Sequence, residues 1–524
     1  MIIFMNRLAH NKRPYLLVLG AMFLYAIILL WGIQQNLPFL PEIDEPFFVT
    51  PAIRIASSGS LNPEWFGQPG STTIYPMALI FHLWYALSQG GSFLHSNPAL
   101  TAHFVRNFSE YYYWGRLVSI IYAIITIPLL YQVGKRLFSH TTGLISIWLF
   151  LFYPLFIFHA QMTRPDSATA FFIMLALWLI LRVYDQSRLT LHLLAGLAIG
   201  FSIGTKYVLL ALAPVYLLVC LIHIWQKRQT AHFKAEISKS MAGLLMIVVG
   251  FAISTPYFFL DFNTALENIL LEARSEHLGA DGLSKGQNFW FYLTDALPKI
   301  ITWPELILAY VAIAISILRR NVPQLLLISL LFIYFVGISL SPLHWVRWAL
   351  QVIPIFALFA AEGLRHTALM IKKYLEKFTF IHRYVLVGLV LLVSASPIYE
   401  TVLHNIKQSN LSTRVLAREW LLENAAPNSK IAQEWYTAFL KDTSFEVVDS
   451  WALGQDRVVL DYYDEDFDYL VVSSGMYFRF YADPERSPSQ VQFYDSLADE
   501  AALVQEFTPS ATRGGSVIKI YQLP

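Results

Sequence analysis

Apolar runs long enough to cross a membrane as helices recur along most of this chain. A bilayer core about 30 Å thick takes roughly 20 residues of α-helix. Only 14% of the 524 residues are charged, whereas soluble domains carry about 25%. The sequence therefore predicts a mainly α-helical, multi-pass membrane bundle of about eleven spans, at residues 15–33, 113–133, 143–159, 167–182, 191–204, 207–225, 241–258, 300–318, 322–341, 348–364 and 384–402.

The distribution of Lys and Arg orients these spans. If the N-terminus is cytoplasmic, the loops on that side hold about twice as many basic residues as the outer loops, which is the positive-inside asymmetry. An odd number of spans then places the C-terminus outside, and residues 34–112 and 259–298 become the two largest outer loops. The stretch "MIIFMNRLAHNKRP" has no cleavage motif, which indicates a retained first helix and not a removed signal peptide.

The composition changes from about Leu403 onward. This tail has ten Lys and Arg against eighteen Asp and Glu. Its short runs "DYLVVSS" and "SVIKIYQL" are typical of strands, and "STRVLAREWLLENA" is typical of a helix that ends before Pro427. We expect a membrane domain at residues 1–402 and a soluble, extracytoplasmic α/β domain at 403–524.

Two adjacent acids, Asp44 and Glu45, follow the first span in "PEIDEPFFVTPAIRIA". Pro46 suits the first turn of a helix, with Glu45 as its N-cap, and the following residues predict a helix in the plane of the membrane interface. Stabilising the helix end, by about 0.3–1 kcal/mol, is one explanation for the acids. Because one acid is enough for that purpose, we favour a catalytic role for Asp44 and consider one for Glu45.

A second acid lies in "HAQMTRPDSATAFF", where Arg164 and Asp166 fall between two spans at the outer face. A charge beside a span is costly and indicates function by default. The alternatives are a pair that only caps the helix and an Asp44–Asp166 pair that holds a divalent metal. The sequence has no HExxH, CxxC or Gly-rich nucleotide motif, so no cofactor is firmly implied.

Scarce cations recur at the same outer boundary, namely Arg106, Arg116, Lys206 and Arg347. Lys206 and Arg347 stand at the outer ends of spans, and the alternative to a binding role is that such side chains extend to the lipid headgroups. The outer loop "EARSEHLGADGLSKGQNFWFYL" predicts a mobile lid, in which His277 would contact phosphate or serve structure alone. Because cations and acids converge at one level, the pattern favours an anionic headgroup held beside a carboxylate.

Four stretches resemble the GT-C glycosyltransferases, with the protein O-mannosyltransferases and lipid A aminoarabinose transferases as nearest relatives. They are "IDEP" with Arg54 following it, "TRPDSATAFF", "GFSIGTKYVLLALAP" and "TRVLAREWLLENAAPNSKIAQE". The resemblance implies a GT-C-type bundle that moves a sugar from a polyprenyl-phosphate carrier to an extracytoplasmic acceptor. It implies Asp44 as general base, Glu45 as its orienting partner and Asp166 in a second acidic site. The donor phosphate would be held by Lys206, Arg347, Arg164 and Arg54.

The chemistry needs few groups. Polyprenyl phosphate is a good leaving group, so cations that stabilise its charge and one carboxylate base suffice, and a single displacement would invert the anomeric centre. The tail lacks the β-trefoil domain of eukaryotic mannosyltransferases, which favours a prokaryotic plasma (inner) membrane. The acceptor stays open: a hydroxyl, an amine or a lipid phosphate, on a lipid, glycan or protein. We expect no nucleic-acid partner.

Three other functions compete with this one. A transporter or flippase of lipid-linked sugars would bind its substrate near the midplane, often between repeated halves, and the sequence shows no repeat. A metal-dependent oligosaccharyltransferase would transfer a glycan en bloc from a pyrophosphate carrier. A sensor that binds envelope glycan through its soluble domain would not need Asp44.

Overall fold

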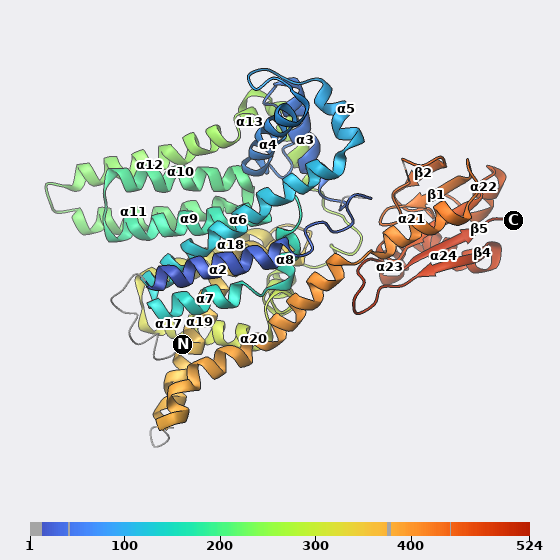
Figure 1. Cartoon of the computed structure of the whole chain (residues 1–524). Coiled ribbons are helices and arrows are strands. Elements are labelled where there is room, and N and C mark those ends of the chain that lie inside the picture. The colour runs from blue at the N-terminus through green and yellow to red at the C-terminus, as the bar shows by residue number, and fades with distance from the viewer. Residues whose placement is uncertain (1–12, 40–41, 375–378, 441) are drawn as a thin grey trace. The chain divides into compact units, whose positions relative to one another are not determined.

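The computed structural model describes residues 13–39, 42–374, 379–440 and 442–524 (Figure 1). The chain divides into two compact units. The helical unit holds the chain up to Leu30, Asp44–Ser275 and Gly282–Thr401. The C-terminal unit holds Trp31–Ile43, Glu276–Asp281 and Val402–Pro524. Two short segments from far upstream therefore pack with the tail.

The first half of the helical unit contains the segments that carry most of the charged residues singled out above. Figure 1 shows α9, α10, α11 and α12 running lengthwise side by side, with α3, α4 and α5 gathered near one end. The elements are α2 (Arg13–Leu30), α3 (Pro46–Ser58), α4 (Ser71–Gln89), α5 (Ala99–Arg106), α6 (Phe108–Leu137), α7 (His140–Phe150), α8 (Pro154–Ala160), α9 (Asp166–Asp185), α10 (Leu189–Thr205), η2 (Tyr207–Ala211), α11 (Leu212–Lys227) and α12 (Phe233–Ser254).

The second half begins with short helices in place of the expected long outer loop. These are α13 (Tyr257–Leu260), α14 (Phe262–Glu272), α15 (Lys285–Phe291), η3 (Tyr292–Ala296) and α16 (Leu297–Ile300). Long helices follow: α17 (Trp303–Arg319), α18 (Val322–Ser339), η4 (Val346–Val352), α19 (Ile353–Tyr374) and α20 (Thr379–Ser409).

The prediction of a helical membrane bundle is confirmed. Each predicted span overlaps one or more helices of the structure. Seven described helices are long and apolar enough to cross a membrane, or eight if the bent pair α7–α8 is one span. The count of eleven therefore stays a prediction. Residues 34–112 contain α4, a 19-residue helix that the hydropathy pattern did not predict. The N-terminal stretch before Arg13 lies outside the described residues.

Helices α10 and α12 approach each other closely because glycines face the contact. A Cβ atom built on Gly200 would lie 2.4 Å from the carbonyl oxygen of Ile247, and one on Gly250 would lie 2.6 Å from that of Leu197. Small residues permit such backbone contacts in membrane bundles. This packing fixes the end of α10, after which Lys206 follows directly.

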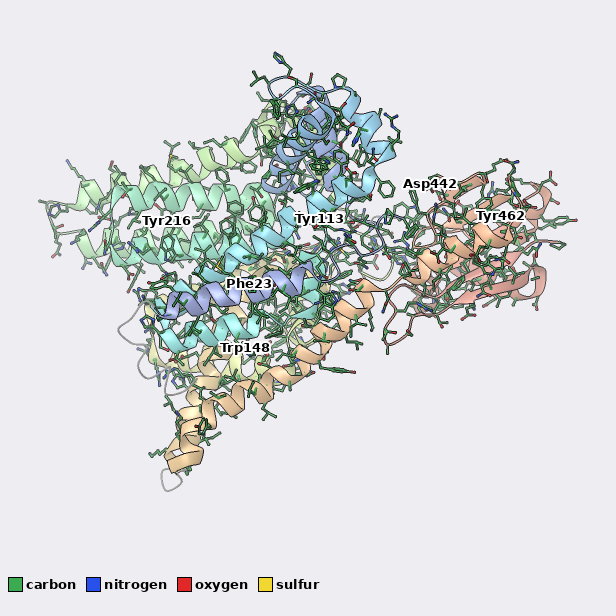
Figure 2. All side chains as sticks on the ribbon, in the orientation of Figure 1. Phe23, Tyr113, Trp148, Tyr216, Asp442 and Tyr462 are labelled. Atoms are coloured by element: carbon green, nitrogen blue, oxygen red, sulfur yellow. The ribbon has the colours of Figure 1, made fainter. Side chains whose placement is uncertain are left out.

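A break between α7 and α8 brings the second acidic segment into place. The two helices are bent by 70°, and Pro154 begins α8 because a proline cannot continue the preceding helix. After α8, the Gln161 side-chain amide donates to the backbone carbonyl of Leu29 at 3.3 Å. Trp148, labelled in Figure 2, donates to the Ser394 hydroxyl of α20 at 3.0 Å. These bonds hold α7 and the Arg164 segment against neighbouring helices.

The C-terminal unit is an α/β fold, as its composition predicts. Its sheet has the order β2-β1-β3-β5-β4, in which β1 pairs in parallel with β2 and β3, and β5 pairs antiparallel with β3 and β4. The strands are β1 (Lys430–Glu434), β2 (Glu446–Ser450), β3 (Tyr469–Ser473), β4 (Ala502–Phe507) and β5 (Ile518–Gln522), and the helices are α21 (Thr413–Asn424), α22 (Val459–Asp464), α23 (Ser474–Ala482) and α24 (Pro488–Glu500).

The upstream segments of the C-terminal unit are attached by specific contacts. Leu278 packs against the hydrophobic core around β3, and Arg486 pairs with Asp281 at 2.9 Å and with Glu276 at 3.1 Å. Gly32 lies so close to Gln408 that an added Cβ would be 2.8 Å from the Gln408 Cβ. Both segments are therefore structural parts of this unit.

The close contact of α10 and α12 predicts a large effect for one methyl group. Gly200→Ala should lower the free energy of unfolding by about 1–3 kcal/mol because the backbone on the other side has no room to move. Gly388→Ala is the matched control, since nothing lies within 4 Å of its added Cβ, and it should be neutral or stabilising. Thermal unfolding of the purified variants in one detergent measures both. Equal midpoints for the two would contradict the packing described here.

Candidate active site

Asp44 lies where three distant parts of the helical unit meet. Its Oδ2 accepts from Arg164 Nη2 at 2.6 Å and from Arg347 Nη1 at 2.8 Å. Arg164 belongs to the α8–α9 connection and Arg347 to η4. The Asp44 side chain is 38% exposed, so a substrate can reach it. Burial alone would raise the pKa of Asp44, but the two guanidinium groups outweigh it and lower that pKa below its usual value.

Asp166 is the buried counterpart of Asp44. It is the first residue of α9, and its Oδ1 accepts from Lys206 Nζ and from Gln351 Nε2, both at 3.2 Å. Its Oδ2 lies 3.6 Å from Arg164 Nε, so Arg164 contacts both acids. Three cations, Arg164, Arg347 and Lys206, therefore face two carboxylates. One positive charge is left in excess, which suits binding of a singly charged anion.

Glu45 stands at the N-cap of α3, as predicted, but its side chain is bonded elsewhere. It precedes α3, but its side chain makes no capping hydrogen bond. Instead Oε1 and Oε2 accept from Arg116 Nε at 2.8 Å and Nη2 at 2.7 Å, and Oε1 also accepts from the Thr163 amide at 2.9 Å. Both members of the Glu45–Arg116 pair are 0% exposed. These bonds therefore anchor Glu45 in the interior, and it has no surface with which to touch a substrate.

The helix after the acids also differs from the interfacial helix that was predicted. Phe48, Ile53 and Ile55 of α3 are buried, and α3 packs extensively against α4. Its apolar face is covered by protein, and Phe47 is the exposed exception. Where a long outer loop was predicted, the structure thus has two helices, α3 and α4, packed against each other.

A cavity of about 600 Å³ opens beside Lys206. Two kinds of side chain line it. The charged and amide ones are Gln68, Lys206, Glu272 and Gln351, and the apolar and aromatic ones come mostly from η2, α11 and α18, including Leu210, Pro214, Ile333 and Ile338. Such a mixed lining fits a molecule with a polar head and an apolar chain.

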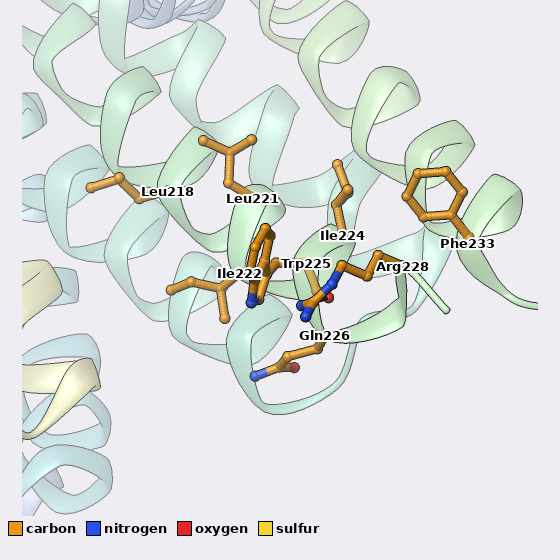
Figure 3. A pocket seen from close by; sticks show the side chains of 8 residues that line it. All are labelled: Leu218, Leu221, Ile222, Ile224, Trp225, Gln226, Arg228 and Phe233. Atoms are coloured by element: carbon orange, nitrogen blue, oxygen red, sulfur yellow. Dashed lines mark hydrogen bonds between the residues drawn. The ribbon is translucent and has the colours of Figure 1, made fainter. Parts of the chain in front are cut away.

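Another hollow lies along α11, at the end of the helix away from Lys206 (Figure 3). Most of its lining side chains are apolar, among them Leu218, Leu221 and Phe233. The guanidinium of Arg228 stands 3.8 Å from the ring centre of Trp225. No carboxylate lines this hollow among the described residues, so it lacks the acid–cation arrangement found around Asp44.

Two other residues that were predicted to hold the donor phosphate, Arg54 and His277, make different contacts in the structure. Arg54 is bound to Glu64 at 2.7 Å and to the Pro63 carbonyl at 3.2 Å, and these contacts do not include the Asp44 cluster. His277 belongs to the C-terminal unit, where its backbone amide donates to Asp281. A role of His277 in phosphate binding stays a prediction.

The alternative role of Asp44 and Asp166 was to hold a divalent metal together. Asp44 and Asp166 are each bonded to cationic side chains. Within the described ranges, no group of three or more His, Cys, Asp and Glu side chains is placed to hold a metal ion.

Two contributors were not predicted as such. Gln351 was not singled out, although an amide side chain within an apolar run is itself a signal. Arg116 was recognised only as an outer cation.

Comparison with solved structures places this geometry in a known fold. The apo structure of ArnT from Cupriavidus metallidurans has a TM-score of 0.55 and 14% identity, over 96% of this chain and 98% of that chain. The same protein bound to undecaprenyl phosphate gives 0.53 and 14%, over 97% of each chain. The chain has the GT-C fold.

Further comparisons agree with a GT-C fold. An Archaeoglobus fulgidus oligosaccharyltransferase tethered to an acceptor peptide has a TM-score of 0.50 and 13% identity, over 97% of this chain and 74% of that chain. The family described as dolichyl-phosphate-mannose-protein mannosyltransferase matches residues 99–255, which contain Arg164, Asp166 and Lys206 but not Asp44. No curated protein matches the chain by sequence.

The buried Glu45–Arg116 pair predicts that the two adjacent acids respond differently to loss of charge. Glu45→Gln leaves the Arg116 charge buried without its counter-ion, and should destabilise the protein by about 3–5 kcal/mol. Asp44→Asn, the matched isosteric change at a partly exposed site, should cost much less. Thermal unfolding in detergent compares the two. The opposite order of stabilities would refute the assignment of Glu45 as the buried anchor.

Proposed function

We propose that this protein is a membrane glycosyltransferase that moves a sugar from a polyprenyl-phosphate carrier to an extracytoplasmic acceptor. The observation that carries the proposal is the reachable Asp44 carboxylate, which shares Arg164 and Arg347 with a cation cluster beside a cavity that is partly apolar. A lipid-linked sugar phosphate has the matching parts: a charged diester, a sugar and an apolar chain. The ArnT relative has been captured with undecaprenyl phosphate, a molecule of this class.

Charge matching supports a monophosphate donor. A polyprenyl-phosphate sugar is a diester with one negative charge, which the single excess positive charge of the cluster would balance. When the bond between the anomeric carbon and the phosphate oxygen breaks, the phosphate gains a second negative charge. Lys206, Arg164 and Arg347 would stabilise that charge as it develops, and the arginines can grip phosphate oxygens bidentately.

Asp44 would act on the acceptor. Its carboxylate removes the proton of the acceptor hydroxyl while that oxygen attacks the anomeric carbon, and the departing phosphate takes the electrons of the broken bond. A single displacement of this kind inverts the anomeric configuration. The phosphate also competes with Asp44 for the guanidinium groups of Arg164 and Arg347. Donor binding would thereby weaken the interactions that lower the pKa of Asp44 and make it a stronger base.

The location of the reaction follows from the predicted orientation. With the N-terminus cytoplasmic and the C-terminal unit outside, Asp44 lies at the outer face of a plasma (inner) membrane. The acceptor is then a lipid, glycan or protein of the envelope. A chelator distinguishes this reaction from metal-dependent en bloc transfer, because catalysis by Asp44 and the cations alone should persist in its presence.

Loss of the Asp44 charge should strongly reduce turnover while leaving the fold intact. Asp44→Asn should reduce sugar transfer by about 10²- to 10⁴-fold, the usual contribution of a general base. The measurement is release of undecaprenyl phosphate from a panel of undecaprenyl-phosphate sugars, with an envelope fraction as acceptor source. Glu64→Gln, which removes the partner of Arg54, is the matched surface control and should retain activity. Full activity of Asp44→Asn would exclude Asp44 as the base.

The lowered pKa of Asp44 predicts where activity falls in acid. A carboxylate whose pKa is lowered stays ionised to lower pH, so the acid limb of kcat/KM should lie below about pH 4 in the wild type. Arg347→Ala removes one of the groups that lower the pKa, and should move that limb to higher pH. The pH profiles of both proteins test this. A wild-type limb near neutral pH, or one unmoved by Arg347→Ala, would contradict the assignment.

A further inference from the structure

The cavity beside Lys206 contains a carboxylate that the proposed phosphate chemistry does not use. Glu272, the last residue of α14, lines this cavity together with Lys206. No hydrogen bond or ion pair joins its side chain to another residue in the part of the chain that the structure describes. Asp44, Asp166 and Glu45 are all neutralised by cations, so Glu272 is the acid near the donor cavity that keeps its bonding capacity.

The position of Glu272 is fixed by contacts to its neighbour in the cavity lining, the loop before α4. In that loop the Phe66 amide donates to the side chain of Asn268 of α14 at 2.9 Å. An added Cβ on Gly67 would lie 2.6 Å from Glu272 Cγ, so the end of α14 fits closely against a glycine. The same loop is tied to the start of η2, since the Tyr207 hydroxyl donates to the Phe66 carbonyl at 2.9 Å. Glu272 therefore belongs to a well-packed part of the cavity lining.

A carboxylate is a poor neighbour for a phosphate, because like charges repel. Its presence in a cavity with Lys206 makes sense if the ligand carries hydrogen-bond donors next to its phosphate. The cavity also offers the Gln68 amide and the half-buried ring of Trp348. A carboxylate, an amide and an aromatic face supply an acceptor, a second polar partner and an apolar surface, which together fit a sugar ring.

We propose that Glu272 recognises the sugar of the donor by accepting hydrogen bonds from its O–H or N–H groups. This inference rests on the proposed function, since it takes the Lys206 cavity as the donor site. Lys206 holds the phosphate, and Glu272 contacts the sugar attached to it. Glu272 thereby distinguishes a loaded carrier from the bare carrier that remains after transfer. Repulsion between Glu272 and the doubly charged product phosphate also favours its exit.

The test compares loaded and bare carriers in binding to the purified full-length protein in lipid nanodiscs. The probes are undecaprenyl phosphate and a panel of undecaprenyl-phosphate neutral and amino sugars. The wild type should bind at least one loaded carrier more tightly than the bare carrier. Glu272→Ala should weaken the binding of that loaded carrier by about 10- to 100-fold, the range for a charge-assisted hydrogen bond. Its affinity for the bare carrier should be unchanged or higher. Lys206→Ala should weaken both.

Two variants sharpen the result. Glu267→Ala, at an exposed position of the same helix, is the matched control and should change neither affinity. Glu272→Gln keeps an acceptor oxygen but removes the charge. It should therefore bind a carrier of a neutral sugar nearly as tightly as the wild type does, but should bind a carrier of an amino sugar more weakly. Equal weakening of bare and loaded carriers by Glu272→Ala, no weakening of either, or a wild type without preference for any loaded carrier would overturn the inference. If Lys206→Ala affects neither carrier, the donor site itself is wrong.

Discussion

The buried pair of Glu45 and Arg116 is the interaction on which the arrangement of the site depends. It joins the loop after α2 to α6, and the third bond of Glu45, from the Thr163 amide, adds the α8–α9 connection. Removing two charges from water is expensive, and such a pair contributes little net stability. What it does contribute is position: with Glu45 held inward, its neighbour Asp44 faces the other way, and Arg164 follows Thr163 directly into contact with Asp44.

Other polar side chains of the site also bond to more than one partner. Arg164 contacts both acids, and Gln351 completes the surroundings of Asp166 while its own carbonyl oxygen accepts from the Tyr334 hydroxyl at 2.9 Å. Both η4 residues that reach the acids, Arg347 and Gln351, are four positions apart on one short helix. The groups that we propose to bind phosphate are thus connected to one another before any ligand arrives, which is the preorganisation that electrostatic catalysis requires.

Much of the cluster could be predicted because charges are rare in an apolar chain. Asp44, Arg164, Asp166, Lys206 and Arg347 stand out for that reason, and the GT-C fold brings them together. The sequence could not show which of two adjacent acids turns inward, since Glu45 finds its partner 71 residues away. Nor could it show α4, whose polar first turn weakens its hydropathy signal, or the uncharged Gln351. For Arg54 the sequence could not show that a local partner, Glu64, is in reach, and its role in phosphate binding stays a prediction.

The discontinuous make-up of the C-terminal unit has a consequence for how the protein is made. Trp31–Ile43 leaves the ribosome early, yet its packing partners lie after Thr401. Domains tend to fold as units when their sequence is complete. The segment directly before Asp44 can therefore reach its packing partners only after most of the chain has been synthesised. A protein cut before residue 402 would therefore leave Trp31–Ile43 without the residues that it packs against.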